Sequence, residues 1–162
     1  MPESIPAIRI AATTGIVASA WISGSIAGLS LMAVPGMAAG LVPAQELARQ
    51  WEAMFNIGKN LGPGMALFTL LPYSYAAYQR SAGNRDWRSY AVACGLTLAI
   101  VPYTLILMRP TNNQLLAAAA GATRSLGDEA VKDLLGKWKL LNLARSFLPL
   151  FGSLIGLSAL LA

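Results

Sequence analysis

The sequence contains no histidine and only one cysteine, Cys94, among its 162 residues. Histidine is the commonest protein ligand of zinc, copper and haem iron, so the usual sites for these metals lack their main ligand. A single cysteine forms neither an internal disulfide nor a CxxC redox pair. The composition excludes a dithiol oxidoreductase, and we predict that any activity of the chain needs no added cofactor.

Charged residues are also scarce, at 12% of the chain, whereas soluble domains carry about 25%. Four long stretches are apolar and nearly free of charge, and they cover about residues 10–34, 61–79, 89–108 and 138–161. Each is close to the roughly 20 residues that a helix needs to cross a membrane. We therefore expect an all-α integral membrane protein, a four-helix bundle that forms one domain over residues 1–162.

Two other structures fit these stretches less well. A cleaved signal peptide is a poor description of the first stretch, because only Arg9 gives it a basic flank and its apolar run is too long. A soluble four-helix bundle would show a charged face on each helix, and these stretches do not.

The net charge of +5 raises the question of nucleic-acid binding. The basic residues, however, are scattered between the apolar stretches and do not form one basic surface with stacking aromatics. We predict that they flank the membrane near lipid headgroups and that the chain binds no nucleic acid. The segment RSAGNRDWR, residues 80–88, predicts a tight turn with interfacial aromatic residues around it.

Between the first two stretches, the segment from Pro43 predicts a short amphipathic helix. Leu47, Trp51, Met54 and Phe55 fall on one face at helical spacing, which suits a helix lying in the membrane interface. The sequence GPG at 62–64 is expected to separate this helix from the second membrane span.

Prolines mark further boundaries in the expected helices. We expect Pro35 to end the first span, Pro102 to kink the third and Pro110 to end it. Pairs of glycines four residues apart let helices approach closely, either within the bundle or between copies of the chain. These pairs are Gly24 with Gly28, Gly36 with Gly40, and Gly152 with Gly156.

The last span carries an unusual polar stripe at helical spacing, formed by Trp138, Asn142, Arg145 and Pro149. In a four-span topology the start of this span and the end of the third span lie on the same side of the membrane. Polar residues at the end of the third span therefore converge on the stripe, and they are Tyr103, Thr111 and Asn112. An arginine at this depth is costly and favours a functional site. The alternative is that Arg145 extends to the headgroups and Asn142 only joins helices.

These residues carry a family resemblance. The segments PYTLILMRPTNNQL and WKLLNLARSFLPL, together with an earlier QW and GPG and the four-span layout, resemble the anthrone oxygenase family. Its members are small membrane proteins of aromatic polyketide pathways. The specific part of the resemblance is the pair PYT…PTN-x-x-L and W-x-x-x-N-x-x-R.

The resemblance implies oxidation of a tricyclic anthrone to an anthraquinone by O₂, without metal, flavin or haem. It implies catalytic roles for four residues, namely Arg145, Asn142, Tyr103 and Asn112. It implies substrate contacts for four others, namely Trp138, Trp51, Thr111 and Pro102. Arginine is always charged and suits an enolate oxygen rather than the role of base.

The general base stays open between Glu46, Glu52 and an ionised Tyr103. The expected partners are a small aromatic polyketide and membrane lipid, with a possible homo-oligomer through the glycine faces. A non-catalytic protein that binds a lipid or a quinone, or a scaffold for other membrane helices, is the alternative function.

Overall fold

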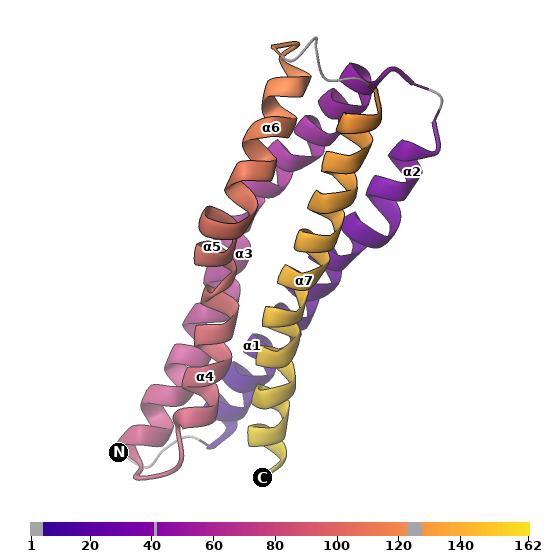
Figure 1. The fold of residues 1–162 in the computed structure, drawn as a ribbon. Helices are drawn as coiled ribbons and strands as arrows, with labels where there is room; N and C mark the ends of the chain where they lie inside the picture. The colour runs from indigo at the N-terminus through magenta and orange to yellow at the C-terminus, as the bar shows by residue number, and fades with distance from the viewer. Residues whose placement is uncertain (1–4, 41, 123–127) are drawn as a thin grey trace. The chain divides into compact units, whose positions relative to one another are not determined.

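The computed structural model describes residues 5–40, 42–122 and 128–162, and every regular element within them is a helix. In chain order (Figure 1) these are α1 (Ile5–Gly28), the π-helix η1 (Leu29–Ala33), α2 (Val34–Ala38), α3 (Ala44–Ala82), α4 (Arg88–Leu98), α5 (Ile100–Tyr103), the π-helix η2 (Thr104–Met108), α6 (Arg109–Ala119) and α7 (Asp128–Leu161). The prediction of an all-α protein is confirmed for this part of the chain.

Three helical runs in the described ranges are long and apolar enough to cross a membrane. They are Ile5–Ala38, Arg88–Ala119 and Asp128–Leu161. The fourth expected span, residues 61–79, lies within α3, which is not among them. Glycine, proline, serine and tyrosine lower the hydropathy of that stretch, so the four-span count stays a prediction.

Helix α3 is one continuous helix where two were expected. It runs for 39 residues, through the GPG sequence at 62–64, so the short amphipathic helix is not a separate element. A proline removes one intrahelical hydrogen bond but keeps a helical φ angle, so a helix can continue where packing holds both flanks. Here Trp51 on one flank and Tyr73 on the other are fully buried.

The expected helix ends at Pro35 and Pro110 are also wrong, because the helices continue to Ala38 and Ala119. In both runs a five-residue π-helix ends two residues before the proline. The physical reason is local. A proline ring clashes with the carbonyl four residues earlier, which is the middle residue of η1 for Pro35 and of η2 for Pro110. The wider π turn relieves that clash and lets the helix go on. The helical run is interrupted for one residue at Ala99, three residues before Pro102, and the kink expected at Pro102 stays a prediction.

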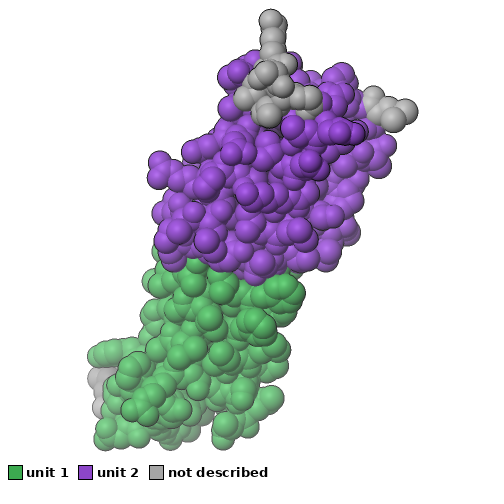
Figure 2. All heavy atoms as spheres, in the orientation of Figure 1, with its two compact units in different colours: residues 1–24, 63–101, 146–162 green, residues 25–62, 102–145 purple. Residues whose placement is uncertain are grey.

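The chain divides into two compact units, coloured separately in Figure 2. The first comprises residues 1–24, 63–101 and 146–162. Its core contains Tyr73, which is fully buried in a slot made by glycines. An ideal Cβ atom on Gly156 would lie 2.7 Å from the Tyr73 hydroxyl, and one on Gly15 would lie 2.7 Å from its ring. Gly156 therefore allows close packing within the chain, which is one of the two roles expected for the pair Gly152 and Gly156.

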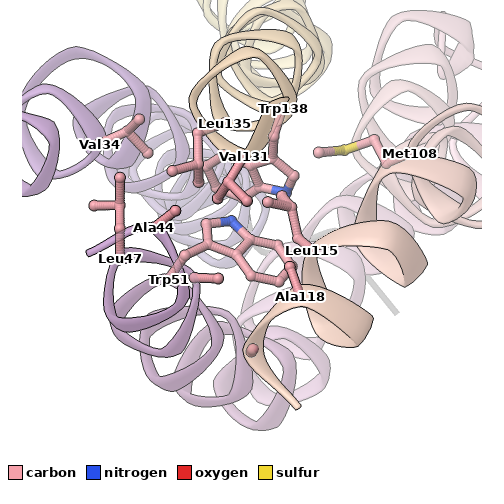
Figure 3. Packing of buried hydrophobic residues seen from close by; sticks show 12 residues of the cluster. Val34, Ala44, Leu47, Trp51, Met108, Leu115, Ala118, Val131, Leu135 and Trp138 are labelled. Atoms are coloured by element: carbon pink, nitrogen blue, oxygen red, sulfur yellow. The ribbon is translucent and has the colours of Figure 1, made fainter. Parts of the chain in front are cut away.

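The second unit comprises residues 25–62 and 102–145 and holds the larger apolar cluster. Figure 3 shows this cluster, in which Trp51 from α3 lies among side chains of α6 and α7. Every residue that the sequence singled out as catalytic or substrate-binding belongs to this unit. The site is therefore described within the second unit alone.

Candidate functional site

Asn142 joins α7 to the first helical run through its side-chain amide, whose nitrogen and oxygen are both hydrogen-bonded. Its side chain is completely buried. The Nδ2 group donates to the Ile26 carbonyl oxygen and to Ser30 Oγ, each at 2.8 Å. Its Oδ1 accepts a hydrogen bond from Arg145 Nη2 at 2.6 Å. Because both donors are used, the amide orientation is fixed with its oxygen towards the guanidinium.

Arg145 is held by neutral oxygen atoms. Its Nη1 donates to Thr104 Oγ1 at 2.7 Å, and Nη2 donates to Asn142. Tyr103 lies within electrostatic range of the guanidinium. Among the described residues, Arg145 has no carboxylate at ion-pair distance, and its buried Nε has no hydrogen-bond partner. A partly buried cation with neutral neighbours and an unpartnered Nε–H is suited to binding an anion.

The two π-helices position the partners of Asn142 and Arg145. Ser30 is the second residue of η1, and Thr104 is the first residue of η2. A π-helix shifts the side chains that follow it around the helix axis and often occurs at functional sites. The prolines at 35 and 110 therefore act on the site indirectly, through the π-helices that precede them.

A second group of residues surrounds the indole of Trp138. Its Nε1 donates to Asn112 Oδ1 at 3.0 Å, and both side chains are buried. The Trp51 ring meets Trp138 edge to face, with centroids 5.7 Å apart, and stacks on Phe55 at 5.0 Å. Within the part of the chain that the structure describes, the buried Trp51 Nε1 has no hydrogen-bond partner. The result is an aromatic cluster with one unused donor, and Figure 3 shows two of its rings, those of Trp51 and Trp138.

The remaining predicted residues are placed less centrally. Tyr103 is partly buried and packs against the larger apolar cluster of the second unit, Thr111 is buried on α6, and Pro102 is exposed. Asn112 Oδ1 accepts its hydrogen bond from Trp138, and the hydrogen bonds of Arg145 go to Thr104 and Asn142. The structure thus brings Asn142 to Arg145 and Asn112 to Trp138, as two separate hydrogen-bonded groups.

The carboxylates expected as possible bases differ in their surroundings. The Glu46 side chain is half exposed and lies 3.7 Å from Arg49 Nη1, in a surface ion pair one helical turn along α3. Glu52 is partly buried. In the described ranges, no three histidine, cysteine, aspartate or glutamate side chains gather as metal ligands would.

Two polar residues of the site escaped the sequence analysis, namely Ser30 and Thr104. Serine and threonine are common in membrane helices, where they bond to their own backbone, so neither stands out by type. The usable signal was position, since each precedes a helix-internal proline by five or six residues.

Comparison with known proteins places the chain in a family. The family described as anthrone oxygenase matches residues 51–155. Anthrone oxygenase AgnL2 of Paecilomyces divaricatus is 35% identical over 151 residues, which cover 90% of this chain and 92% of the relative. Anthrone oxygenase tpcL of Aspergillus fumigatus is 32% identical over 162 residues, covering 99% of each. Noranthrone monooxygenase of Aspergillus flavus is 33% identical over 147 residues, covering 88% of this chain and 69% of the relative. No solved structure matches.

The fold and the site define an all-helical protein with apolar helices of membrane-spanning length and a partly buried arginine held by neutral groups. The chain belongs to the anthrone oxygenase family. It is an anthrone oxygenase-like monooxygenase, as the resemblance of its two motifs predicted.

Proposed function

We propose that the chain is a membrane-embedded oxygenase that uses O₂ to convert an anthrone-type tricyclic polyketide into an anthraquinone, without metal, flavin or haem. The names of the relatives support the substrate class and the reaction. The three apolar helical runs support membrane embedding, which also suits a flat, apolar substrate. The unused Nε of the buried Arg145 guanidinium is the observation that carries the assignment of the site.

The chemistry of the substrate makes a cofactor unnecessary. An anthrone is acidic at the carbon opposite its carbonyl, and loss of that proton gives an electron-rich enolate. The enolate passes one electron to O₂, and the resulting carbon radical and superoxide combine into a C–O bond. Protonation gives a hydroperoxide. Its O–O bond then breaks as the same carbon loses its second hydrogen, so that the hydrogen and the outer OH leave as water and the new carbonyl remains. The balance is anthrone plus O₂ to anthraquinone plus water.

In this proposal Arg145 stabilises the enolate oxygen. A fixed cation and N–H donor, away from bulk water, lowers the energy of a developing oxyanion most strongly. One N–H of Nη1 is engaged by Thr104 and one N–H of Nη2 by Asn142, and the Nε–H, which has no partner among the described residues, is the donor that we assign to the substrate. Asn142 and Thr104 are then positioning residues, which orient the guanidinium without contacting the substrate.

The aromatic cluster supplies the binding surface. The edge-to-face pair of Trp138 and Trp51 supplies aromatic surface against which a tricyclic ring system would bind, and the Trp51 Nε1, which has no partner among the described residues, supplies a donor for one of its oxygens. For the base we propose Tyr103, because it directly precedes Thr104, which binds the guanidinium, whereas Glu46 is paired with Arg49 at the surface. Tyr103→Phe should then lose activity, and Glu46→Gln and Glu52→Gln should keep it.

The decisive experiment is oxygen uptake by the purified chain with a panel of anthrones, followed by identification of the product. The protein is treated with a chelator and shown by absorbance to contain no flavin or haem. We expect one O₂ consumed per quinone formed. Strict dependence on an added metal or flavin contradicts the proposal. Saturable binding without turnover instead supports the alternative of a binding protein.

Thr104 offers a matched pair of variants for the positioning role. Thr104→Val keeps the shape of the side chain and removes the acceptor of Arg145 Nη1, whereas Thr104→Ser keeps the hydroxyl. We expect Thr104→Val to lower kcat about ten-fold with little change in KM, and Thr104→Ser to restore it. Equal activity of the two variants contradicts the role.

A further inference from the structure

A surface hollow of about 210 Å³ lies between α2 and α7, in the second unit. Its lining from α2 includes Val34, and its lining from α7 consists of Lys132, Leu135, Gly136 and Lys139. The proposed oxidation assigns no substrate contact to any of these residues. The hollow is therefore a feature of the unit that holds the site but has no role in the chemistry described above.

The floor of the hollow belongs to the apolar cluster that contains the two site tryptophans. Val34 and Leu135 line the hollow and are only 4% and 2% exposed. Both are members of the same cluster as Trp51 and Trp138, and Figure 3 shows all four side chains together. Along α7, Leu135 comes three residues before Trp138, so the two side chains share one helical face. The apolar surface thus continues from the hollow to the proposed substrate-binding surface.

Gly136 keeps the hollow open. It is in the interior of α7, and an ideal Cβ atom built on it has no atom of the described residues within 4 Å. A glycine inside a helix lowers the stability of the helix, so an open position here has a cost. Pockets that enclose a whole small molecule measure about 300–1,000 Å³, so this smaller hollow accommodates one end of a tricyclic ring system.

Two lysines give the hollow a positive charge. Lys132 and Lys139 are seven residues apart, which places both on the face of α7 that lines the hollow. Lys132 is exposed and Lys139 is partly buried. In the part of the chain that the structure describes, neither ammonium is within ion-pair distance of a carboxylate, although acidic residues are close to Lys132 in the sequence. Two unpaired cations beside an apolar floor favour a ligand that is apolar and anionic at one end.

We propose that this hollow is a docking site for an anthrone that carries an anionic substituent on an outer ring. Lys132 and Lys139 pair with the anionic group, while the apolar rings lie against Val34 and Leu135. Charge complementarity at the lysines and continuity of the floor with the aromatic cluster both select this occupant. The proposal rests on the proposed function, because it names the class of anthrone that the same site oxidises.

The first test compares oxygen uptake by the purified full chain with anthrone and with an anthrone carboxylic acid. An exposed ion pair contributes up to about five-fold in affinity, so two lysines contribute roughly ten-fold. We expect Lys132→Gln/Lys139→Gln to raise KM for the carboxylic acid about ten-fold, without changing its kcat or the KM for anthrone. The control Lys59→Gln/Lys137→Gln removes the same charge from exposed positions that do not line the hollow, and it should leave both KM values unchanged.

Filling the hollow gives a second test that changes no charge. Gly136→Leu places a side chain in open space, so the backbone need not move. We expect kcat/KM to fall about ten-fold for both substrates, because the rings are forced into an occupied volume. Gly58→Leu adds the same side chain at an exposed position of α3, also with open space around its Cβ among the described residues, and should keep wild-type kinetics.

Docking is also measured without turnover, by equilibrium dialysis of the chain with an anthraquinone carboxylate, a product analogue. We expect the Lys132→Gln/Lys139→Gln variant to bind it about ten-fold more weakly than wild type. Equal affinity of the two proteins, or equal losses in the two double variants, overturns the proposal. Loss of anionic lipid from the lysine variant with unchanged KM values assigns the hollow to a lipid and also overturns it. Binding of the carboxylate that depends on the lysines, without oxidation of either anthrone, supports the docking site and contradicts the proposed function instead.

Discussion

Replacing Arg145 with lysine tests the proposed oxyanion role by a small chemical change. The guanidinium donates one N–H of Nη1 to Thr104 and one N–H of Nη2 to Asn142, and its Nε–H has no partner among the described residues. A lysine ammonium is a single point charge that cannot hold two acceptors in a plane and present a third N–H beyond them. We expect kcat to fall by about 10²–10³-fold, the usual effect of removing one donor from an oxyanion site.

The assay is anthrone-dependent oxygen uptake, compared with Arg109→Lys as a control at an exposed position. Arg145→Met should abolish turnover without lowering the unfolding temperature in detergent, because it removes a cation whose burial in a membrane costs a few kcal/mol. If Arg145 only extends to the headgroups, lysine would serve as well as arginine. Full activity of a folded Arg145→Lys variant would therefore refute the assignment.

Three further predictions concern stability and topology. Gly156→Ala should destabilise the chain by about 1–3 kcal/mol, because the new Cβ lies 2.7 Å from the buried Tyr73 hydroxyl. Gly24→Ala should not, because nothing lies within 4 Å of its Cβ. Thermal unfolding in detergent checks both variants. Trp138→Phe should cost about 1 kcal/mol beyond its lost packing, because Asn112 Oδ1 loses its donor; a chemical denaturation curve that matches wild type contradicts this. Reporter fusions at the two ends of the chain should label from the same side of the membrane, and labelling from opposite sides contradicts the four-span prediction.

The contacts within α7 could be predicted from the sequence. Asn142 and Arg145 are three residues apart, and that spacing alone places their side chains on one helical face. The hydrogen bond between them follows from it. Trp138 falls on the same face for the same reason. The helical class also follows from the sequence, because an apolar run in a membrane satisfies its backbone only within a helix or a closed barrel.

The residues on other helices that bind this face of α7 could not be predicted from the sequence. The sequence predicted that Tyr103, Thr111 and Asn112 converge on this face, but the residue of that helical run that accepts a hydrogen bond from Arg145 is Thr104. A helix turns about 100° per residue, so the start of a π-helix at Thr104 decides which of two neighbours faces a given direction. Whether a proline ends a helix or is preceded by a π-helix depends on packing that a single sequence does not specify.

The arrangement around Arg145 lowers the stability of the helices, which indicates that it has a functional role. Pro35 and Pro110 each remove a helical hydrogen bond, and Pro149 does the same for the carbonyl of Arg145 itself. The hydrogen bonds lost at Pro35 and Pro110 lie within a few residues of Ser30 and Thr104, which bind Asn142 and Arg145. The bond lost at Pro149 is that of the Arg145 carbonyl. A bundle selected only for stability would gain by replacing the arginine and the prolines with apolar helix formers. Two further helix-internal prolines, Pro63 and Pro72, lie in α3 within the first unit. A partly buried arginine together with several violations of local helix rules near it is expected where a sequence gives up stability for a functional site.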